Sequence, residues 1–307
     1  MAALLSKRYD QSIGKYVTGD HFTLDDVNNT LFFDVETTTR YKTYAEYLEK
    51  EPNCAKEFAR KVRVDSKWDS MSIEEVYNGN SRSNGMLWAQ HLHVISIAYR
   101  KWNPSTRKYE GDTFGFSSWE EYESIEDKSK ADRDILIKFN EVLCDTFGSD
   151  KGLLGGYNIV GFDIAVLWTR MMVCGIKPHT SLQTVNKKPW DIVHVLDLKS
   201  WTTPSDHKGL SSFDIMNALL GVPSSKTDDV AGNHVGARFW EDHAVEGINE
   251  YCMKDVMSSI ALARRLSEDM IDDIHVQTMA DYYQRLEDAK NEQETETNTQ
   301  EEGQDNG

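Results

Sequence analysis

The chain has 307 residues, 39% of them hydrophobic, and a formal net charge of −17. This apolar content can build an ordinary core in one large domain or two small ones. No apolar run reaches the roughly eighteen residues of a membrane span, and the start "MAALLSKRYDQS" lacks a secretion signal, which predicts a cytoplasmic protein without membrane contact. The four cysteines form no C-x-x-C pair, which argues against a zinc ribbon or a disulfide framework.

The first half of the chain predicts three strands, at residues 31–35, 93–102 and 112–116, from apolar and β-branched runs. Between the first two lies a long insertion, about residues 40–90, whose helical pattern breaks at Pro52. Eight basic residues between positions 40 and 67 make this part of the insertion locally basic, namely Arg40, Lys42, Lys50, Lys56, Arg60, Lys61, Arg63 and Lys67. A solvated helical face and an element that covers a substrate both fit this pattern.

The second half alternates helical patterns with short apolar runs. Helices are expected at 131–147, at 163–175 with Gly175 as the stop, at 210–222 with Gly221 as the stop, and at 244–266; strands are expected within 152–158 and 192–198. Strands with interleaved helices predict an α/β fold.

An acidic pair stands at the end of the first predicted strand, in the stretch "LFFDVETTTR". Because successive side chains of a strand point to opposite faces, Asp34 and Glu36 share one face while Phe33 and Val35 share the other. Two like charges on one face repel unless something positive lies between them. A divalent metal ion, a basic partner and water beyond a strand edge are the three alternatives.

Two further acids lie on predicted helices, at positions that suit a functional carboxylate. In "YNIVGFD", Asp163 begins a helix directly after a strand and a turn, where the helix dipole favours an ionised carboxylate. In "YCMKD", Tyr251 and Asp255 are four residues apart and therefore lie on one face of the longest predicted helix. Either element alone also fits an ordinary helix acid or a boundary tyrosine.

Taken in chain order, the three segments are D-x-E on a first strand, N-x-x-x-F-D at a helix start and Y-x-x-x-D on a late helix. Together they resemble the motifs of 3′→5′ exonucleases of the DEDD superfamily with tyrosine in the last motif (DEDDy). The resemblance implies a ribonuclease H-like fold, a mixed sheet flanked by helices.

The resemblance can be narrowed within that superfamily. The stretch "GGYNIVGFDIAVLWTR" is similar to the second motif of the proofreading domain of family B DNA polymerases. The segments "KPWDIVHVLDL" and "LSSFDIMNALLGVPSSKTDDVAG" resemble the stand-alone predicted exonucleases related to that domain, which occur in bacteria and phages. The resemblance covers about residues 30–268, and the sequence departs from the family in the insertion and in the acidic end.

The family's chemistry carries over to the matching acids. The resemblance implies that Asp34, Glu36, Asp163 and Asp255 hold two ions about 4 Å apart, which activate the attacking water and stabilise the departing 3′ oxygen. Donors that are all oxygen suit Mg²⁺ or Mn²⁺ and disfavour zinc. Tyr251 is implied to orient the attacking water through its hydroxyl.

The substrate contacts follow from the same motifs. Asn158 and Phe162 would support the terminal nucleotide and the turn that aims Asp163, although Phe162 equally fits a place in the core. Thr37, which completes the D-x-E-T stretch, is a candidate substrate contact. Lys226 is a candidate phosphate contact, with a merely solvated loop lysine as the alternative.

The implied activity is removal of nucleoside 5′-monophosphates, one by one, from 3′ ends of DNA, with single strands as the simplest substrate. An acidic protein repels phosphate backbones, so contact with nucleic acid must be local and metal-assisted. A 3′→5′ exoribonuclease of the same superfamily and a catalytically inactive nucleic-acid-binding scaffold are the alternatives. The roughly forty residues after 268 are too few for a polymerase domain, so proofreading would need a replication or repair protein as partner.

The expected domain organisation has four parts. Residues 1–30 form an N-terminal extension, 31–268 the exonuclease domain with its insertion, and 269–286 a C-terminal helix. From Glu287 onward the sequence has eight acids and one lysine and no large apolar residue, which predicts a disordered acidic tail over 287–307.

Overall fold

The computed structural model describes residues 22–77, 89–184, 187, 192, 194–202, 212–223 and 235–267, and the backbone of two short paired strands, β1 (Arg8–Asp10) and β2 (Lys15–Val17). The expected C-terminal helix and acidic tail, and Lys226, lie outside these residues. Within the described part of the chain, no helix is both long and apolar enough to cross a bilayer.

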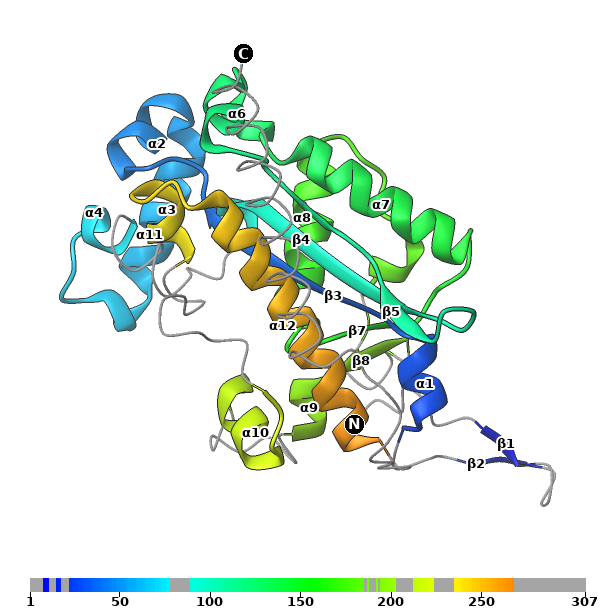
Figure 1. The fold of residues 1–307 in the computed structure, drawn as a ribbon. Helices are drawn as coiled ribbons and strands as arrows, with labels where there is room; N and C mark the ends of the chain where they lie inside the picture. Colours follow the sequence, from blue (N-terminus) through cyan, green and yellow to red (C-terminus); the bar gives the residue numbers. More distant parts are fainter. Residues whose placement is uncertain are drawn as a thin grey trace, which may run out of the picture.

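A six-stranded mixed sheet forms the centre of the molecule (Figure 1). Its order is β5 (Lys108–Glu110), β4 (Leu92–Asn103), β3 (Leu31–Thr39), β7 (Leu154–Gly156) and β8 (Val195–Asp197), and β6 (Thr113–Gly115) pairs with β4. The pairing of β3 with β4 is antiparallel, whereas β3 with β7 and β7 with β8 are parallel. This mixed sheet flanked by helices confirms the expected α/β architecture.

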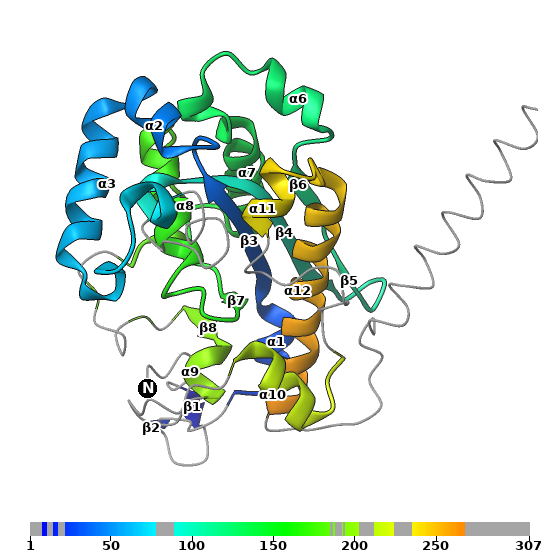
Figure 2. The ribbon, with the colours of Figure 1, turned by 90° about the vertical axis from the view of Figure 1, so that its left-hand side faces the viewer.

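Helices cover both faces of the sheet, as the side view in Figure 2 shows. On one face lie α7 (Arg133–Phe147) and α8 (Asp163–Val173), and on the other lies α12 (Val245–Leu266), which packs on β3 and β4. The apolar residues that predicted α7 form the face that this helix buries. The core contains Ile135, Leu136, Phe139 and Leu143.

The other helices outside the insertion are short. They are α1 (Leu24–Asn29), α6 (Trp119–Ser124), α9 (Leu198–Thr202), α10 (Phe213–Leu220) and α11 (Val235–Trp240), with 3-10 turns at Ser66–Trp68, Ala89–His91, Lys128–Lys130 and Thr180–Leu182. As predicted, α10 ends at Gly221, whose φ of 67° lies in the left-handed region that glycine adopts without cost.

Part of the expected N-terminal extension belongs to the core. Thr23 caps α1 together with Asp26 in a reciprocal capping box, and this orients the helix against α12. Phe22 and Val27 are fully buried beside Met257 of α12 and its apolar neighbours. Residues from 22 onward therefore pack with the domain that was expected to begin at residue 31.

The insertion forms a small helical unit with a core of its own. It contains α2 (Tyr44–Lys50), α3 (Pro52–Val64) and α4 (Ile73–Glu75), and the predicted break at Pro52 is the start of α3. Aromatic rings fill its interior, with centroids 5.1 to 6.4 Å apart among Tyr41, Tyr44, Tyr47, Phe58 and Tyr77. This unit therefore has a persistent shape beside the end of β3.

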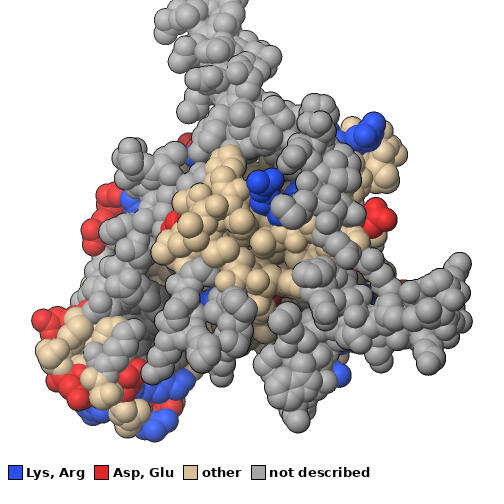
Figure 3. Space-filling view, turned by 90° about the horizontal axis from the view of Figure 1, so that it is seen from below, with Lys and Arg blue, Asp and Glu red and all other residues tan. Residues whose placement is uncertain are grey.

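The expectation that the insertion is locally basic is incomplete, because it counted cations alone. Residues 40–90 contain nine Lys and Arg and eight Asp and Glu, so the net charge of the insertion is only +1. Arg60 forms an ion pair with Glu57 at 2.7 Å. Figure 3 accordingly shows blue and red atoms mixed on its left-hand side, the side on which Figure 1 places α2 to α4. The insertion is a surface of mixed charge.

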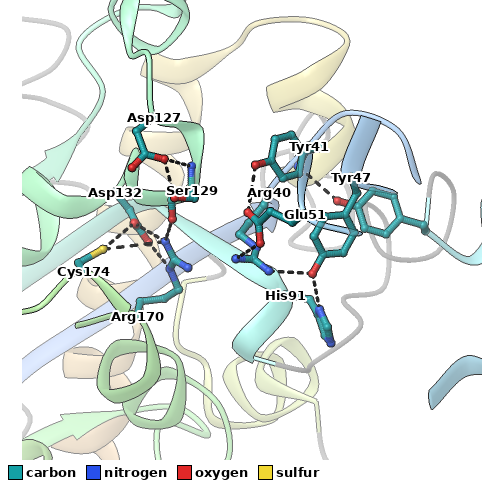
Figure 4. A network of polar contacts seen from close by, with 11 residues as sticks. Arg40, Tyr41, Tyr47, Glu51, His91, Asp127, Ser129, Asp132, Arg170 and Cys174 are labelled. Carbon is teal, nitrogen blue, oxygen red and sulfur yellow. Dashed lines mark hydrogen bonds and ion pairs between the residues drawn. The ribbon is translucent and has the colours of Figure 1, made fainter. Parts of the chain in front are cut away.

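A buried network ties the insertion to the sheet (Figure 4). Arg40 pairs with Glu51 at 2.8 Å and donates a hydrogen bond to the Tyr47 hydroxyl at 2.7 Å. The same hydroxyl lies 2.7 Å from Nδ1 of His91. One tyrosine of α2 thus joins the chain where it enters the insertion, at residue 40, and where it returns to β4, at residue 91. These contacts hold the insertion in a defined orientation.

A second buried network, also in Figure 4, ties α8 to strand β4. The Arg170 guanidinium binds both carboxylate oxygens of Asp132 at 2.7 Å, and both side chains are completely buried. Asp132 also accepts the backbone N–H of Val94 at 3.1 Å. The guanidinium and these hydrogen bonds hold the pKa of Asp132 below its ordinary value, against the effect of burial. This pair fixes α8, the helix that begins at Asp163, against β4.

Candidate functional site

The first two acids of the candidate site stand on β3, the central strand. Asp34 lies opposite Ala98 and Glu36 opposite Ser96 of β4, so both project from the same face of the sheet. The register then shifts by one residue, since Thr37 lies opposite Val94 and Ile95 has no partner. A β-bulge of this kind bends the strand and re-aims neighbouring side chains. It lies directly after Glu36.

Asp163 reaches the same strand from the other edge. The described pairing of β7 with β3 covers only Leu31 and Phe32. Farther along β3, the Val35 N–H donates instead to Oδ1 of Asp163 at 3.0 Å. Asp163 is the first residue of α8 and is only 4% exposed. Its carboxylate therefore binds the backbone between the two acids of β3.

The fourth acid comes from α12, which crosses the face of the sheet that carries the acids. Oxygen atoms of Asp34, Glu36 and Asp255 all lie within 4.8 Å of one another. Asp163 is not a member of this group of three, although its charge acts on both Asp34 and Glu36. Three of the four predicted acids thus converge directly, and the fourth approaches along the backbone of β3.

These carboxylates oppose one another electrostatically. Burial, followed by the charges of Asp255 and Asp163, raises the pKa of Asp34 well above its ordinary value. Burial, followed by the neighbouring acids, does the same to the pKa of Glu36. Burial raises the pKa of Asp163 to about 8, partly offset by the hydrogen bonds it accepts. Without a cation among them, burial and mutual repulsion both oppose the ionisation of these groups.

The donors present fit a hard divalent cation. The converging groups offer only carboxylate oxygens, the ligands that Mg²⁺ and Mn²⁺ prefer. The mutual repulsion of these acids is what a cation between them would relieve. Asp34, Glu36 and Asp255 are the residues placed to hold it, with Asp163 adjacent.

Tyr251 lies one helical turn before Asp255 and is 5% exposed. Its hydroxyl forms a hydrogen bond with the Asp255 carboxylate. Burial and the charges of the neighbouring acids raise the pKa of this phenol, so the hydroxyl keeps its proton and acts as a donor. The predicted tyrosine therefore points at the acids rather than at solvent.

The predicted substrate residues have different surroundings. Thr37 is half-buried directly after Glu36. Asn158 is half-buried with a φ of 64°, and its side-chain oxygen accepts a hydrogen bond from Lys199 at 3.1 Å. Phe162 is half-buried and packs against the core, which agrees with the core alternative for this residue.

Two residues near the acids were not predicted from the sequence. Cys252, fully buried on α12, points its thiol at the backbone oxygen of Asp34 at 3.4 Å and at Oδ2 at 3.6 Å. Asp197 ends β8, is 6% exposed, and accepts backbone N–H groups of the turn before Asp163. The signal for Asp197 was present, since an acid ends the apolar run "IVHVLDL" as Asp34 ends "LFFD".

Residues 95–302 match the model of a family described as "Predicted 3′-5′ exonuclease related to the exonuclease domain of PolB". The matched span contains Asp163, Tyr251 and Asp255, whereas Asp34 and Glu36 precede it. No curated protein matches the chain.

Among solved structures, the chain is similar to the family B DNA polymerase of the hyperthermophilic archaeon Pyrobaculum calidifontis, with 17% identity and a TM-score of 0.46. The match covers 77% of this chain and 24% of the polymerase chain. The family match, in contrast, extends over more than half of the chain and agrees with the resemblance of the motifs. The chain belongs to the family of predicted 3′→5′ exonucleases related to the exonuclease domain of PolB.

Proposed function

We propose that this protein is a metal-dependent 3′→5′ exonuclease that releases nucleoside 5′-monophosphates from DNA, with single-stranded 3′ ends as its substrate. The observation that carries the proposal is the convergence of Asp34, Glu36 and Asp255 within 4.8 Å, from two elements of a family member, beside the Asp163 carboxylate. A structural role alone gives no reason to gather repelling carboxylates at the centre of a sheet.

The acids would hold Mg²⁺ or Mn²⁺. Two such ions, when bound, would supply an activated water and stabilise the departing 3′ oxygen. The chain itself contributes the positions of the carboxylates. Val35 fixes Asp163 through its N–H, and α12 brings Asp255 to the strand. A preformed set of ligands reduces the reorganisation that ion binding would otherwise require.

Tyr251 would orient the attacking water. Its hydroxyl keeps its proton and donates it to a carboxylate of the site, so its oxygen can accept a hydrogen bond from a water beside the same acids. Thr37, half-buried after Glu36, and Asn158, half-buried in the turn before Asp163, would contact the terminal nucleotide. The protein would contact the phosphate backbone only locally, because its net charge of −17 opposes broader binding.

The test is digestion of end-labelled single-stranded DNA, duplex DNA and RNA of one sequence, each with Mg²⁺, with Mn²⁺ or with a chelator. We expect rapid shortening of single-stranded DNA with either ion and none with the chelator. Preference for RNA by a factor of ten or more would identify an exoribonuclease instead, through contacts to the 2′ hydroxyl. Binding of DNA without cleavage under every condition would identify an inactive scaffold and contradict the proposal.

A further inference from the structure

Asp197 is a buried carboxylate close to the acids but outside their group. It is the last residue of β8 and lies in register with Gly156 at the end of β7. Because it is 6% exposed, solvation does not account for it. A buried carboxylate needs partners that offset the loss of water.

Those partners are backbone amides of a single turn and of the residues after the strand. Oδ1 accepts the N–H of Asn158 at 2.9 Å and that of Lys199 at 3.1 Å. Oδ2 accepts the N–H of Val160 at 2.9 Å. Hydrogen bonds to an ionised acceptor are roughly twice as strong as neutral ones. One side chain thus fixes a turn that lies 37 and 39 residues earlier in the sequence.

The turn held in this way has an unusual backbone. Asn158 adopts a φ of 64°, in the left-handed region that side chains other than glycine seldom occupy. Its carbonyl oxygen then accepts the N–H groups of Gly161 at 3.0 Å and Phe162 at 3.1 Å. The next residue is Asp163, the start of α8. The direction in which α8 presents Asp163 therefore depends on this turn.

We propose that Asp197 is a positioning residue for the metal site, an inference that rests on the proposed function. By holding the N–H groups of Asn158 and Val160, Asp197 fixes the turn that aims the Asp163 carboxylate at the backbone of β3. Lys199, two residues later, orients the side chain of the same turn, because its Nζ donates to Oδ1 of Asn158 at 3.1 Å. The strand end of β8 thereby sets the placement of an acid on α8.

Two variants of the full-length protein separate placement from charge. Asp197→Asn removes the charge and replaces one of the two acceptor oxygens by an amide that cannot accept the turn's N–H. Asp197→Glu keeps the charge but moves the carboxylate by one methylene. Mn²⁺ binding is measured by titration calorimetry, and amide exchange at Asn158 and Val160 is measured by NMR. Neither readout requires cleavage, so both remain informative if the protein proves to lack nuclease activity.

We expect both variants to bind Mn²⁺ about 10-fold or more weakly than the wild type, the scale typical of residues that orient metal ligands. Amide exchange at the two turn positions should accelerate by a similar factor in Asp197→Asn. The matched control is Asp26→Asn, which removes another carboxylate that binds a backbone N–H, that of Thr23 in the cap of α1, a helix that carries none of the acids. It should lower thermal stability while leaving Mn²⁺ affinity within twofold of wild type.

The outcomes distinguish the explanations. Wild-type affinity in Asp197→Glu would show that only the charge matters and would overturn the positioning role. If Asp197→Asn does not fold, Asp197→Glu alone decides the matter, because it preserves the charge and its burial. An equal loss of Mn²⁺ affinity in Asp26→Asn would assign the effect to general destabilisation and would also overturn the inference.

Discussion

At the scale of single residues, the site consists of carboxylates that are held closer than their charges favour. One carboxylate oxygen each of Asp34, Glu36 and Asp255 lies within 4.8 Å of the others, and burial together with the neighbouring charges raises the pKa of the first two. The fold therefore holds a repulsion that a bound cation would convert into attraction. Stability and metal binding should respond in opposite directions when one of these charges is removed.

Asp34→Asn tests this opposition. In chelator the variant should be at least as stable as the wild type, with a melting temperature unchanged or higher by about 2–4 °C, because one repelling charge is gone. Mn²⁺ should stabilise the wild type by ligand linkage and have little effect on the variant. Differential scanning calorimetry with and without Mn²⁺ measures both. A variant that is strongly destabilised in chelator would show that Asp34 has favourable partners in the metal-free protein.

Tyr251→Phe separates the tyrosine hydroxyl from the acids. The ring stays in its buried place beside Ile248, so stability and Mn²⁺ affinity should hardly change. If the hydroxyl orients the attacking water, its loss should lower kcat by about 10²-fold, the scale of one positioned catalytic hydrogen-bonding group. Single-turnover cleavage at saturating Mg²⁺ is the measurement. A rate within twofold of wild type would remove Tyr251 from the mechanism.

At the scale of elements, the insertion and the sheet are joined by a few buried polar contacts. The Tyr47 hydroxyl accepts a hydrogen bond from Arg40, at the start of the insertion, and is hydrogen-bonded to His91, at its end. Glu51 forms an ion pair with the Arg40 guanidinium. Burial lowers the pKa of His91 to about 3, so this imidazole is neutral and depends on hydrogen bonding rather than on charge. The Tyr47 hydroxyl therefore determines whether the insertion keeps one orientation relative to β3.

Tyr47→Phe should destabilise the protein by about 1–3 kcal/mol, because it removes one hydrogen-bond partner from each of two buried polar side chains. The melting temperature should fall by about 2–4 °C per kcal/mol. Tyr44→Phe is the matched control from the same aromatic cluster, since its hydroxyl binds the neutral backbone oxygen of Ala55 at 3.2 Å. Equal losses in the two variants would contradict a special role for the Tyr47 hydroxyl.

The long elements could be predicted from the sequence because their signals are local. The apolar run at residues 31–35 predicts the central strand, which continues to Thr39 as the β-branched threonines allow. Helices α7 and α12 follow from their apolar spacing. Helices such as α6 and α11 span only six residues, which is too short for a periodic pattern to stand out.

The acids of the site were predictable for the same reason, since each lies in a local motif. The contacts that place them were not, because their partners are distant in sequence. Asp197 binds a turn almost forty residues earlier, and Asp163 binds Val35 across 128 residues. The tertiary fold alone brings such groups together. The basic character expected of the insertion is weaker for another reason, since the acids interleaved with its cations reduce its net charge to +1.

At the scale of the whole molecule, an acidic protein must act on a polyanion. The net charge of −17 opposes DNA binding everywhere except where cations intervene, so substrate and metal should depend on each other. Added salt should weaken this general repulsion as well as local attraction, which sets the protein apart from basic nucleases whose affinity falls steeply with salt. Metal dependence is therefore the property on which the account rests.

The most direct test of this account follows 5′-labelled single-stranded DNA over time with wild-type protein and with Asp34→Asn. In Mg²⁺ the wild type should produce a ladder that descends from the full length in steps of one nucleotide, with nucleoside 5′-monophosphate as the released product. Chelator should stop the reaction, and the variant should leave the DNA intact. Fragments cut at internal positions, or a variant as active as the wild type, would contradict the claim that these acids form a 3′→5′ exonuclease site.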